Sequence, residues 1–534
     1  MENISFKHIL ADHAKHFPDK RAVIFNHQER FTEDKILTYR EFNSRCCRLA
    51  NGLLELGFSR GDHITMLSMN NSDYAELYWG LPKAGFVLVP INFRFVGDEI
   101  LYIVNHSDTK AIIFEQQYLN TINSIRSKFE KVKDNGYIII GDHTPKGMTN
   151  YKELLARSPD TEPDIEVKET EPSLLVYTSG TTARPKGVVK TEGSLIWFII
   201  QVAYHYHWHP DVVTIISTPH YHLGGEIMTH APLYLGGTVI VQRQFEPVDW
   251  LELVAKYKAD SFWLIPTALN QVVNLPDEVL TKYDLSSVGD IMSSGAPLHA
   301  ETWDKARKLF PNGKIHNFYC STEHGGSTIL FQDDKDQANR PAECIGLPAL
   351  GARVKIGDSQ GNELPCGQLG EIWVKVASNA TEYYKNPEAN EEGFKNGWLS
   401  VGDMGRQDEE GYYYIIDRKK DMIITGGENV SPRDVEEIIY RHPKVLEAAV
   451  LGVPDDKWGE AIRAVIVPKP GEKATQEEVI QFCRGKIASY KIPKSADFVD
   501  SLPKTPTGKI LKKDIRQALL EGYEKRLHQP GDFR

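Results

Sequence analysis

The feature that most constrains this chain is the segment YTSGTTARPKGVV, residues 177–189, which directly follows the apolar run Leu-Leu-Val at residues 174–176. The apolar run predicts the end of a strand, and the segment after it is a loop rich in Ser, Thr and Gly that closes with Pro-Lys-Gly. Such a loop offers backbone N–H groups, hydroxyls and one cation, which are the donors that a polyphosphate needs. A Walker P-loop would read G-x-x-x-x-G-K-[ST], and this segment does not. We therefore expect a nucleotide site of another class.

The rest of the chain predicts several α/β layers. A length of 534 residues is too great for one core and implies two to four domains. Helical and strand patterns alternate up to about residue 170 and again to about residue 340, which is typical of parallel α/β layers. The expected helices span residues 42–56 and 74–84, and the expected strands span residues 63–67, 86–90, 214–217, 238–241 and 261–265.

The pattern changes after residue 344. Residues 345–416 carry short strand patterns and frequent turns, which predict a small antiparallel sheet or barrel. A compact α+β pattern follows, with an expected helix over residues 510–527. We therefore expect an α/β fold: a large N-terminal domain of two parallel α/β sheets plus a small β-barrel-like subdomain, and a smaller α+β C-terminal domain. The expected domains are residues 1–417, with subdomains 1–170, 171–344 and 345–417, and residues 418–534.

Composition and charge argue against several classes of protein. A net charge of −11 argues against a general affinity for nucleic acid or anionic membranes. The densest apolar run, residues 195–200, is far too short for an integral membrane segment, and the mixed-charge N-terminus is unlike a signal peptide. Six cysteines without a C-x-x-C pair favour neither a disulfide framework nor a zinc site. These features indicate a cytoplasmic protein.

Ten segments, in order, resemble the adenylate-forming (AMP-binding) superfamily, which comprises acyl- and aryl-CoA synthetases, adenylation domains of peptide synthetases and beetle luciferases. They extend over nearly the whole chain, and ten motifs in register are very specific. The resemblance implies ATP, Mg²⁺ and coenzyme A as cofactors, a carboxylic acid as the small-molecule partner, and a mobile C-terminal domain. The segments are LTYREF (37–42), PKAGFVLVPIN (82–92), YTSGTTARPKG (177–187), TPHYHLGG (218–225), SSGAPL (293–298), NFYCSTEHGG (317–326), GEIWVK (370–375), WLSVGD (398–403), DRKKDMIITGGENVSP (417–432) and PKTPTGKI (503–510).

The resemblance assigns the nucleotide contacts to individual residues. In the family the phosphate loop binds the β and γ phosphates, an aromatic residue stacks on adenine, and one carboxylate ligates Mg²⁺. A hard cation needs oxygen ligands and keeps water and substrate phosphates as the rest of its shell, so one carboxylate suffices. The expected ATP-binding residues are Thr178, Ser179, Gly180, Thr181, Thr182 and Lys186 for the phosphates, Gly295 and Ala296 in SSGAPL, Tyr319 for adenine, Thr322 for the α phosphate, Glu323 for Mg²⁺, and Asp403 and Arg418 for the ribose.

The C-terminal motifs imply a catalytic lysine and a hinge. Lys509 in PKTPTGKI would reach the acyl carboxylate and the α phosphate and stabilise the negative charge that builds on oxygen, so it is also counted among the ATP-binding residues. Thr322, Glu323 and His222 are the other expected catalytic residues. The ordinary alternative is an exposed lysine, and only the Thr-Gly-Lys context separates Lys509 from its neighbours. Lys420 would be the pivot of a rotating domain, although the charged run at 418–421 is also typical of a solvated turn. Gly427 would line the coenzyme A channel, where a glycine allows close approach.

The acyl pocket is expected around the helix after the phosphate loop and the ends of three later segments. Its aromatic and apolar residues favour a fatty or aryl acid over an amino acid. Glu226 and the histidines of segment 205–209 are also compatible with a polar, carnitine-like acid as the substrate. The expected lining residues are Trp197, His222, Gly225, Ser294 and His316, with His222 also near the entrance of the thiol. A satisfied structural histidine is the alternative for His222, and His220 is an alternative match to the same family position.

The expected activity is that of an AMP-forming acyl-CoA synthetase. A carboxylate and ATP would give an acyl-adenylate and pyrophosphate, and the acyl group would then pass to coenzyme A. The alternatives are an acyl-AMP ligase that loads a carrier protein and a ligase for a carnitine-like acid; a homodimer stays open. Three positions depart from the family pattern: Cys320 stands where Gly is usual, Val401 where Thr is usual, and Glu192 where His is usual.

Overall fold

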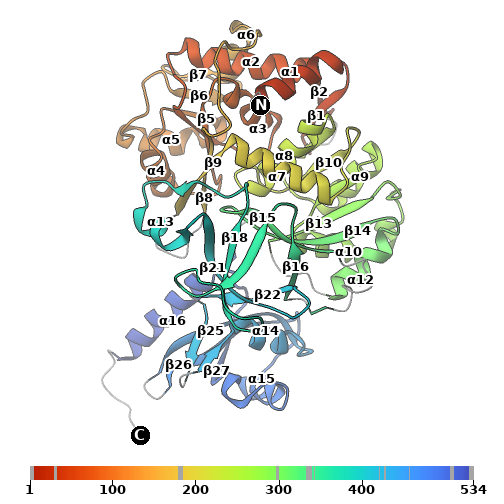
Figure 1. Cartoon of the computed structure of the whole chain (residues 1–534), viewed down its shortest axis with the longest axis vertical. Helices are drawn as coiled ribbons and strands as arrows, with labels where there is room; N and C mark the ends of the chain where they lie inside the picture. The colour runs from red at the N-terminus through yellow and green to blue at the C-terminus, as the bar shows by residue number, and fades with distance from the viewer. Residues whose placement is uncertain are drawn as a thin grey trace. The chain divides into compact units, whose positions relative to one another are not determined.

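The computed structural model describes residues 5–28, 33–178, 185–295, 300–331, 340–341, 343–419, 421–425, 428–455, 458–504 and 510–527. The chain packs into two compact units (Figure 1). Unit 1 comprises residues 1–354 and 374–399, and unit 2 comprises residues 355–373 and 400–534. Within the described ranges, no helix is both long and apolar enough to cross a membrane.

An eight-stranded mixed sheet carries the phosphate-loop segment. Its inner strands run parallel, because long crossovers connect them, whereas the hairpin β8–β9 is antiparallel because a short loop joins it. The expected strand at residues 63–67 is β3, with the same bounds. The strand order is β19 (Glu382–Tyr383), β9 (Lys186–Thr191), β8 (Pro172–Thr178), β4 (Val87–Ile91), β3 (His63–Leu67), β5 (Ala111–Glu115), β6 (Tyr137–Ile140) and β7 (Thr149–Asn150).

Two further groups of strands complete unit 1, and both are mixed. Strands β10, β11 and β1 are parallel with β2 antiparallel to β1, and strands β12, β13 and β14 are parallel with β15 and β16 antiparallel. The α/β class is therefore confirmed, and the sheets expected as parallel are mixed, with antiparallel pairs where short loops join successive strands. The orders are β10 (Val213–Ile216), β11 (Thr238–Gln242), β1 (Arg21–Asn26), β2 (Lys35–Thr38), and β12 (Ser261–Trp263), β13 (Asp290–Ser293), β14 (Lys314–Ser321), β15 (Gly325–Phe331), β16 (Cys344–Pro348).

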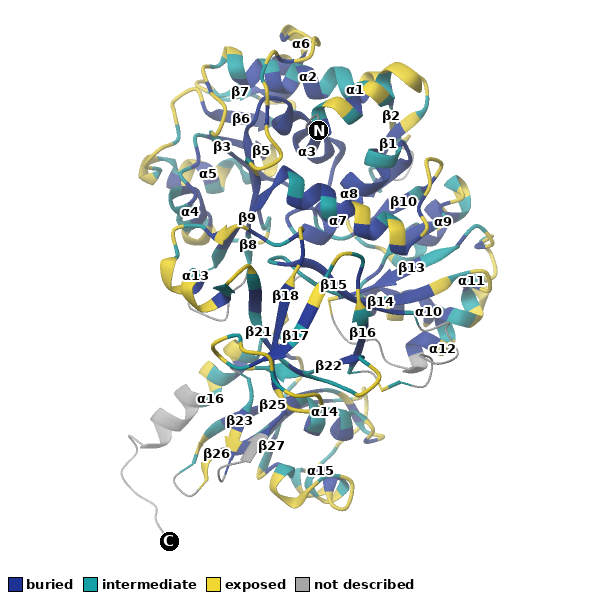
Figure 2. Ribbon diagram, viewed as in Figure 1, coloured by how far each residue is buried: buried dark blue, intermediate teal, exposed yellow. Residues whose placement is uncertain are grey.

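The helices of unit 1 bury their apolar faces against these sheets and against one another. Residues 223–233 of α8 are all buried, so this helix lies in the interior (Figure 2). The expected helix 42–56 is α2, which begins earlier because Thr38 and Glu41 form a capping box. The helices are α1 (Phe6–His16), α2 (Tyr39–Glu55), α3 (Ser72–Lys83), α4 (Gly97–His106), α5 (Leu119–Ile125), α6 (Tyr151–Arg157), α7 (Glu192–His205), α8 (Leu223–Leu235), α9 (Pro247–Tyr257), α10 (Pro266–Val273), α11 (Asp277–Leu280), α12 (Ala300–Leu309) and α13 (Pro387–Gly393).

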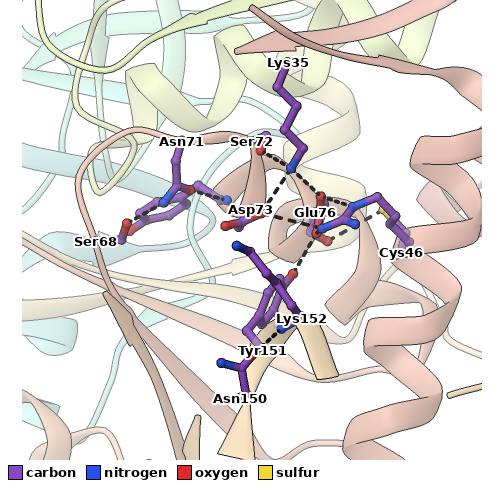
Figure 3. Close-up of polar contacts among 12 residues, drawn as sticks. Lys35, Cys46, Ser68, Asn71, Ser72, Asp73, Glu76, Asn150, Tyr151 and Lys152 are labelled. Carbon is purple, nitrogen blue, oxygen red and sulfur yellow. Dashed lines mark hydrogen bonds and ion pairs between the residues drawn. The ribbon is translucent and has the colours of Figure 1, made fainter. Parts of the chain in front are cut away.

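A buried ion-pair network joins α2, α3 and α6 (Figure 3). The side chain of Glu76 is fully buried, and its carboxylate accepts hydrogen bonds from the Arg45 guanidinium and, at 2.9 Å, from the Tyr151 hydroxyl. Lys35 Nζ lies 3.5 Å from Asp73 and 3.9 Å from Glu76. Every charge in the network has a partner, which is what a buried charge requires. We therefore interpret it as an anchor between helices.

Among the described residues, unit 2 contains two groups of strands and three α-helices. The first group follows an open path in the order β22 (Tyr413–Arg418), β21 (Trp398–Gln407), β18 (Gly370–Lys375), β17 (Arg353–Gly357), so the described strands form an open sheet in place of the barrel-like subdomain expected there. The second group has the order β24 (Glu428–Val430), β23 (Ile423–Thr425), β26 (Gly459–Pro468), β25 (Val445–Asp455), with β27 (Ser495–Phe498) beside β26. The helices are α14 (Pro432–Tyr440), α15 (Gln476–Cys483) and α16 (Lys512–Leu527), and α16 confirms the expected closing helix.

Candidate active site

The two ends of the phosphate loop meet at one edge of the eight-stranded sheet. Thr178 is the last residue of β8 and pairs with Lys186, the first residue of β9. The strands on either side of residues 179–184 are therefore antiparallel neighbours, and β8 confirms the strand end that the sequence predicts before the phosphate loop. The Lys186 ammonium lies 5.1 Å from the centroid of the Tyr383 ring. A cation thus stands at the first residue of β9, next to an aromatic ring, and phosphate binding needs such a cation.

A turn at the end of β14 presents Glu323. The Ser321 hydroxyl accepts hydrogen bonds from the backbone N–H groups of Glu323 at 3.2 Å and of His324 at 3.1 Å, which fixes the turn. The Tyr383 hydroxyl donates to Glu323 Oε1 at 3.2 Å. Tyr383 therefore touches both the lysine of the phosphate-loop strand and the expected Mg²⁺ ligand.

The chemistry of Glu323 fits a hard cation. Oε1 accepts from Tyr383, whereas Oε2 has no hydrogen bond or ion pair among the residues that the structure describes. Within the same ranges, no group of three or more His, Cys, Asp and Glu side chains is placed to hold a metal ion. A single carboxylate is nevertheless sufficient for Mg²⁺, whose other ligands are water and substrate phosphates.

The carboxyl ends of β13 and β14 meet beside this turn, as parallel neighbours do. Ser294 follows β13, and its hydroxyl lies 3.0 Å from the sulfur of Cys320 near the end of β14. Gly295 has a φ of +87°, a conformation that disfavours a side chain. The structure thus brings Ser294 and Cys320 together. No role for Cys320 is predicted from the sequence. Tyr319 and Thr322 stand at this same strand end, and their nucleotide roles remain predictions.

His222 is the N-cap residue of α8 and is half-buried, with its Nε2 atom shielded from solvent. Burial, together with the charge of Arg94, lowers its pKa to about 4, so the imidazole is neutral at physiological pH. Its Nε2 has no hydrogen-bond partner among the described residues. A buried nitrogen without a hydrogen bond destabilises the folded protein. A bound ligand that forms a hydrogen bond with Nε2 would remove this penalty.

Gly225 does not face open space. A Cβ at this position would lie 2.5 Å from the carbonyl oxygen of Pro219, so the glycine permits close packing of the first turn of α8. Trp197 likewise packs closely, since a Cβ on Gly351 would lie 2.5 Å from its ring. His316 is bonded through Nε2 to Asp290 at 3.0 Å. These contacts give all three residues a packing role, and their pocket role remains a prediction.

The histidines of segment 205–209 do not form a common site. His205 is buried and accepts from the backbone N–H of Leu350 at 2.9 Å, and burial lowers its pKa to about 4. His207 and His209 are exposed. Glu226 is buried, and its Oε1 lies 2.6 Å from Nδ1 of His230, but neither carboxylate oxygen makes a hydrogen bond with the described residues. Because the three histidines do not gather in one place, the structure gives less support to a cationic acyl group than the sequence does.

Lys190 is a functional candidate that the sequence analysis missed. It lies on β9, is fully buried, and donates a hydrogen bond to the carbonyl oxygen of Ser378. Desolvation lowers its pKa to about 7, against the opposing charges of Glu226 and Glu323. The signal in the sequence is that this lysine directly follows the apolar pair Val188 and Val189.

The pH dependence of stability should reveal the buried Lys190. Because its pKa is about 7 in the folded protein, against the ordinary lysine value of 10.5, the unfolded chain binds more protons between these values. The free energy of unfolding should therefore rise with pH across that window, by up to about 1.4 kcal/mol per pH unit, relative to Lys190→Met. Urea unfolding of both proteins at several pH values measures the difference, and parallel curves would contradict a depressed pKa.

In unit 2, the two residues that the resemblance assigns to the ribose are paired. Asp403 on β21 lies opposite Arg418 on β22, and Arg418 Nε is 3.4 Å from Asp403 Oδ1. The Asp403 side chain is 7% exposed and that of Arg418 is 37% exposed. Gly402, which precedes Asp403 within β21, has a φ of +78°, a conformation that favours glycine. The carboxylate is thus held in one orientation, which suits recognition of vicinal hydroxyls.

Replacement of Asp403 with Asn should raise the KM for ATP about 10-fold or more, because hydrogen bonds to a charged group contribute about 1.5–3 kcal/mol. The turnover number should change less, since the contact is made in both ground and transition states. Dideoxy-ATP provides the matched control: it lacks the two ribose hydroxyls, so it should bind wild type and variant equally. A wild-type protein that does not distinguish ATP from dideoxy-ATP would contradict the assignment.

Eight predicted site residues lie outside the described residues, and their roles stay predictions. They are Ser179, Gly180, Thr181 and Thr182 in the phosphate loop, Ala296 in SSGAPL, the hinge Lys420, the channel residue Gly427 and the catalytic Lys509.

Comparisons with known proteins agree with this arrangement. Residues 10–384 match the AMP-binding enzyme family, and residues 434–509 match the AMP-binding enzyme C-terminal domain. A feruloyl-CoA synthase from Amycolatopsis sp is 33% identical over 483 residues, which cover 90% of this chain and 94% of the relative. The fatty acid–acyl-carrier-protein ligase ScoC of Streptomyces coeruleorubidus is 29% identical over 514 residues, covering 94% of each chain.

Among solved structures, ATP-bound MatB from Rhodopseudomonas palustris matches with a TM-score of 0.85 and 27% identity, covering 97% of this chain and 100% of that chain. The two family matches together extend over most of the sequence, and the relatives match along almost their full length. The chain therefore belongs to the AMP-binding, adenylate-forming enzyme family, in its acyl-CoA synthetase branch.

Proposed function

We propose that this enzyme activates a fatty or aryl carboxylic acid with ATP and transfers the acyl group to coenzyme A. The proposal rests on the two contacts of Tyr383: its ring lies beside Lys186, and its hydroxyl donates to Glu323. A cation for phosphate and a carboxylate for a metal ion are thereby held close together at the end of the phosphate-loop strand. That combination suits a bound metal–nucleotide complex.

The first step joins the acid to the nucleotide. One oxygen of the carboxylate attacks the α phosphorus, the bond from that phosphorus to the bridging oxygen breaks, and pyrophosphate leaves with the electron pair. Lys186 and the phosphate-loop hydroxyls hold the β and γ phosphates, and Lys509 stabilises the charge that develops on the α-phosphate oxygens. A general base is not needed, since a carboxylic acid is already ionised at neutral pH. Glu323 is the residue that would hold Mg²⁺, which when bound neutralises charge on the phosphates.

The second step transfers the acyl group to a thiol. The thiol sulfur of coenzyme A attacks the acyl carbon, its proton passes to solvent, and AMP leaves with the electron pair of the broken C–O bond. We propose that residues 418–534 form a domain that turns about Lys420, withdraws Lys509 and brings Gly427 to the pantetheine channel. One site then performs two reactions with two faces of one domain.

A carrier protein is the alternative acceptor. The similarity to a fatty acid–acyl-carrier-protein ligase, which covers 94% of both chains, favours this second candidate. The separated histidines of segment 205–209 weigh against a carnitine-like acid. We also propose a cytoplasmic location, which is supported by six cysteines that are all free thiols.

A panel of acids tests substrate and acceptor together. Purified enzyme is incubated with ATP, Mg²⁺ and fatty, aryl, amino and betaine acids, and pyrophosphate release is recorded. Each active acid is then tested with coenzyme A, and the products are identified by mass spectrometry. We expect acyl-CoA and AMP from fatty or aryl acids. Acyl-AMP that accumulates without acyl-CoA would instead establish the carrier-protein alternative.

A further inference from the structure

A short segment of unit 1, residues 378–384, lies between the phosphate-loop strand and the turn that carries Glu323. We call it the bridge segment. On one side it extends the eight-stranded sheet: Tyr383 and Glu382 pair with Val188 and Val189, and the backbone N–H of Thr381 donates to Val189 at 3.1 Å. The bridge segment is therefore hydrogen-bonded along the strand that begins at Lys186.

The same segment is bonded to the turn on its other side. The backbone N–H of Ala380 donates to the carbonyl oxygen of Glu323 at 2.6 Å, and the Ser378 hydroxyl donates to the carbonyl oxygen of His324 at 2.8 Å. The buried Lys190 donates back to the carbonyl oxygen of Ser378. These bonds tie the strand, the bridge segment and the turn into one rigid set.

Tyr383 is the side chain of the bridge segment that reaches both predicted phosphate-site residues. It is 6% exposed, and its ring packs against Phe394 at 5.8 Å. Its hydroxyl donates to Glu323 Oε1, which fixes the rotation of that carboxylate and leaves Oε2 available. Its ring lies 5.1 Å from the Lys186 ammonium, and an aromatic face attracts a cation at this distance.

We propose that Tyr383 is a positioning residue for the metal–nucleotide site: its hydroxyl orients Glu323 and its ring orients Lys186. Partners of this kind tune metal ligands, and their loss typically costs about 10–100-fold in metal affinity. The inference rests on the proposed function, because it takes Glu323 as the residue that holds Mg²⁺. The ordinary alternative is a core tyrosine, which packs with Val188, Ala380 and Ala389 and affects stability alone.

The test compares Tyr383→Phe with Tyr384→Phe in the full-length protein. Tyr383→Phe removes the hydroxyl and keeps the ring beside Lys186. The neighbouring Tyr384 is the matched control, since its hydroxyl donates to Asp108 at 3.0 Å, away from Glu323. Mn²⁺ binding is measured by electron paramagnetic resonance with a non-hydrolysable α,β-methylene analogue of ATP, and melting temperatures are recorded for both variants.

We expect Tyr383→Phe to weaken Mn²⁺ binding about 10-fold while Tyr384→Phe retains wild-type binding. Tyr383→Leu, which also removes the ring, should additionally raise the KM for ATP. Mn²⁺ binding that is unchanged in Tyr383→Phe, or weakened equally in both Phe variants, would overturn the inference alone. Wild-type protein that binds no Mn²⁺ with the analogue would overturn the proposed function, and the inference with it.

Discussion

Lys509→Ala is expected to lower the rate of pyrophosphate release by about 10²–10³-fold, which is the usual cost of removing one preorganised donor from a developing oxyanion. Binding of ATP should change little, because the phosphate loop, Asp403 and Arg418 are untouched. The transfer step should also survive, so the variant should still convert a supplied acyl-adenylate and coenzyme A into acyl-CoA. The two half-reactions, measured separately, therefore distinguish loss of a catalytic group from general loss of structure.

Lys504→Ala is the matched control for Lys509→Ala. Lys504 is a nearby lysine in the same motif that pairs with Glu447 at the surface. Surface ion pairs contribute little to stability, so this variant should keep wild-type rates. Equal losses in Lys504→Ala and Lys509→Ala would remove the special role assigned to Lys509.

Glu323→Gln is expected to reduce pyrophosphate release by about 10²-fold and to shift its Mg²⁺ dependence to higher concentrations. Glutamine has nearly the same shape and can still accept the hydrogen bond from Tyr383, so the turn should persist. It lacks the charge that a hard cation requires of its ligand. Initial rates over a range of Mg²⁺ concentrations measure both effects.

The neighbouring Glu382→Gln provides the control for charge alone, because Glu382 is exposed on β19 next to Tyr383. It should leave the Mg²⁺ dependence as in the wild type. An unchanged Mg²⁺ dependence in Glu323→Gln would mean that the cation is held elsewhere, and Glu323 would then be a structural residue of the turn.

Local elements of the fold follow from the sequence because their signals are local. The strand at 63–67 appears with the predicted bounds, and α2 starts at its capping box. Sheet composition is not local: β1 and β2 share a sheet with β10 and β11, and Val23 of β1 lies opposite Val239 of β11. Periodicity shows that a segment is a strand but does not choose its neighbours or its direction. The mixed sheets were missed for that reason.

The candidate site likewise contains residues that local motifs predict and residues that only the fold brings into place. Thr178, Lys186 and Glu323 lie in motifs that are continuous in sequence, and the structure brings Lys186 and Glu323 to one side chain. Tyr383 and Lys190 were missed because their roles depend on pairings with distant residues. Tyr383 reaches Glu323, 60 residues away, only because β19 adds to the edge of β9. No spacing rule predicts that contact.

The most direct test of the central claim follows one oxygen atom. An accepted acid labelled with heavy oxygen in its carboxylate is incubated with the enzyme, ATP and coenzyme A, and the AMP is analysed by mass spectrometry. Attack of the carboxylate on the α phosphorus, followed by attack of the thiol on the acyl carbon, leaves one labelled oxygen on AMP. We predict that singly labelled AMP forms in amounts equal to acyl-CoA. Unlabelled AMP, or ADP and phosphate as products, would contradict an adenylate-forming mechanism.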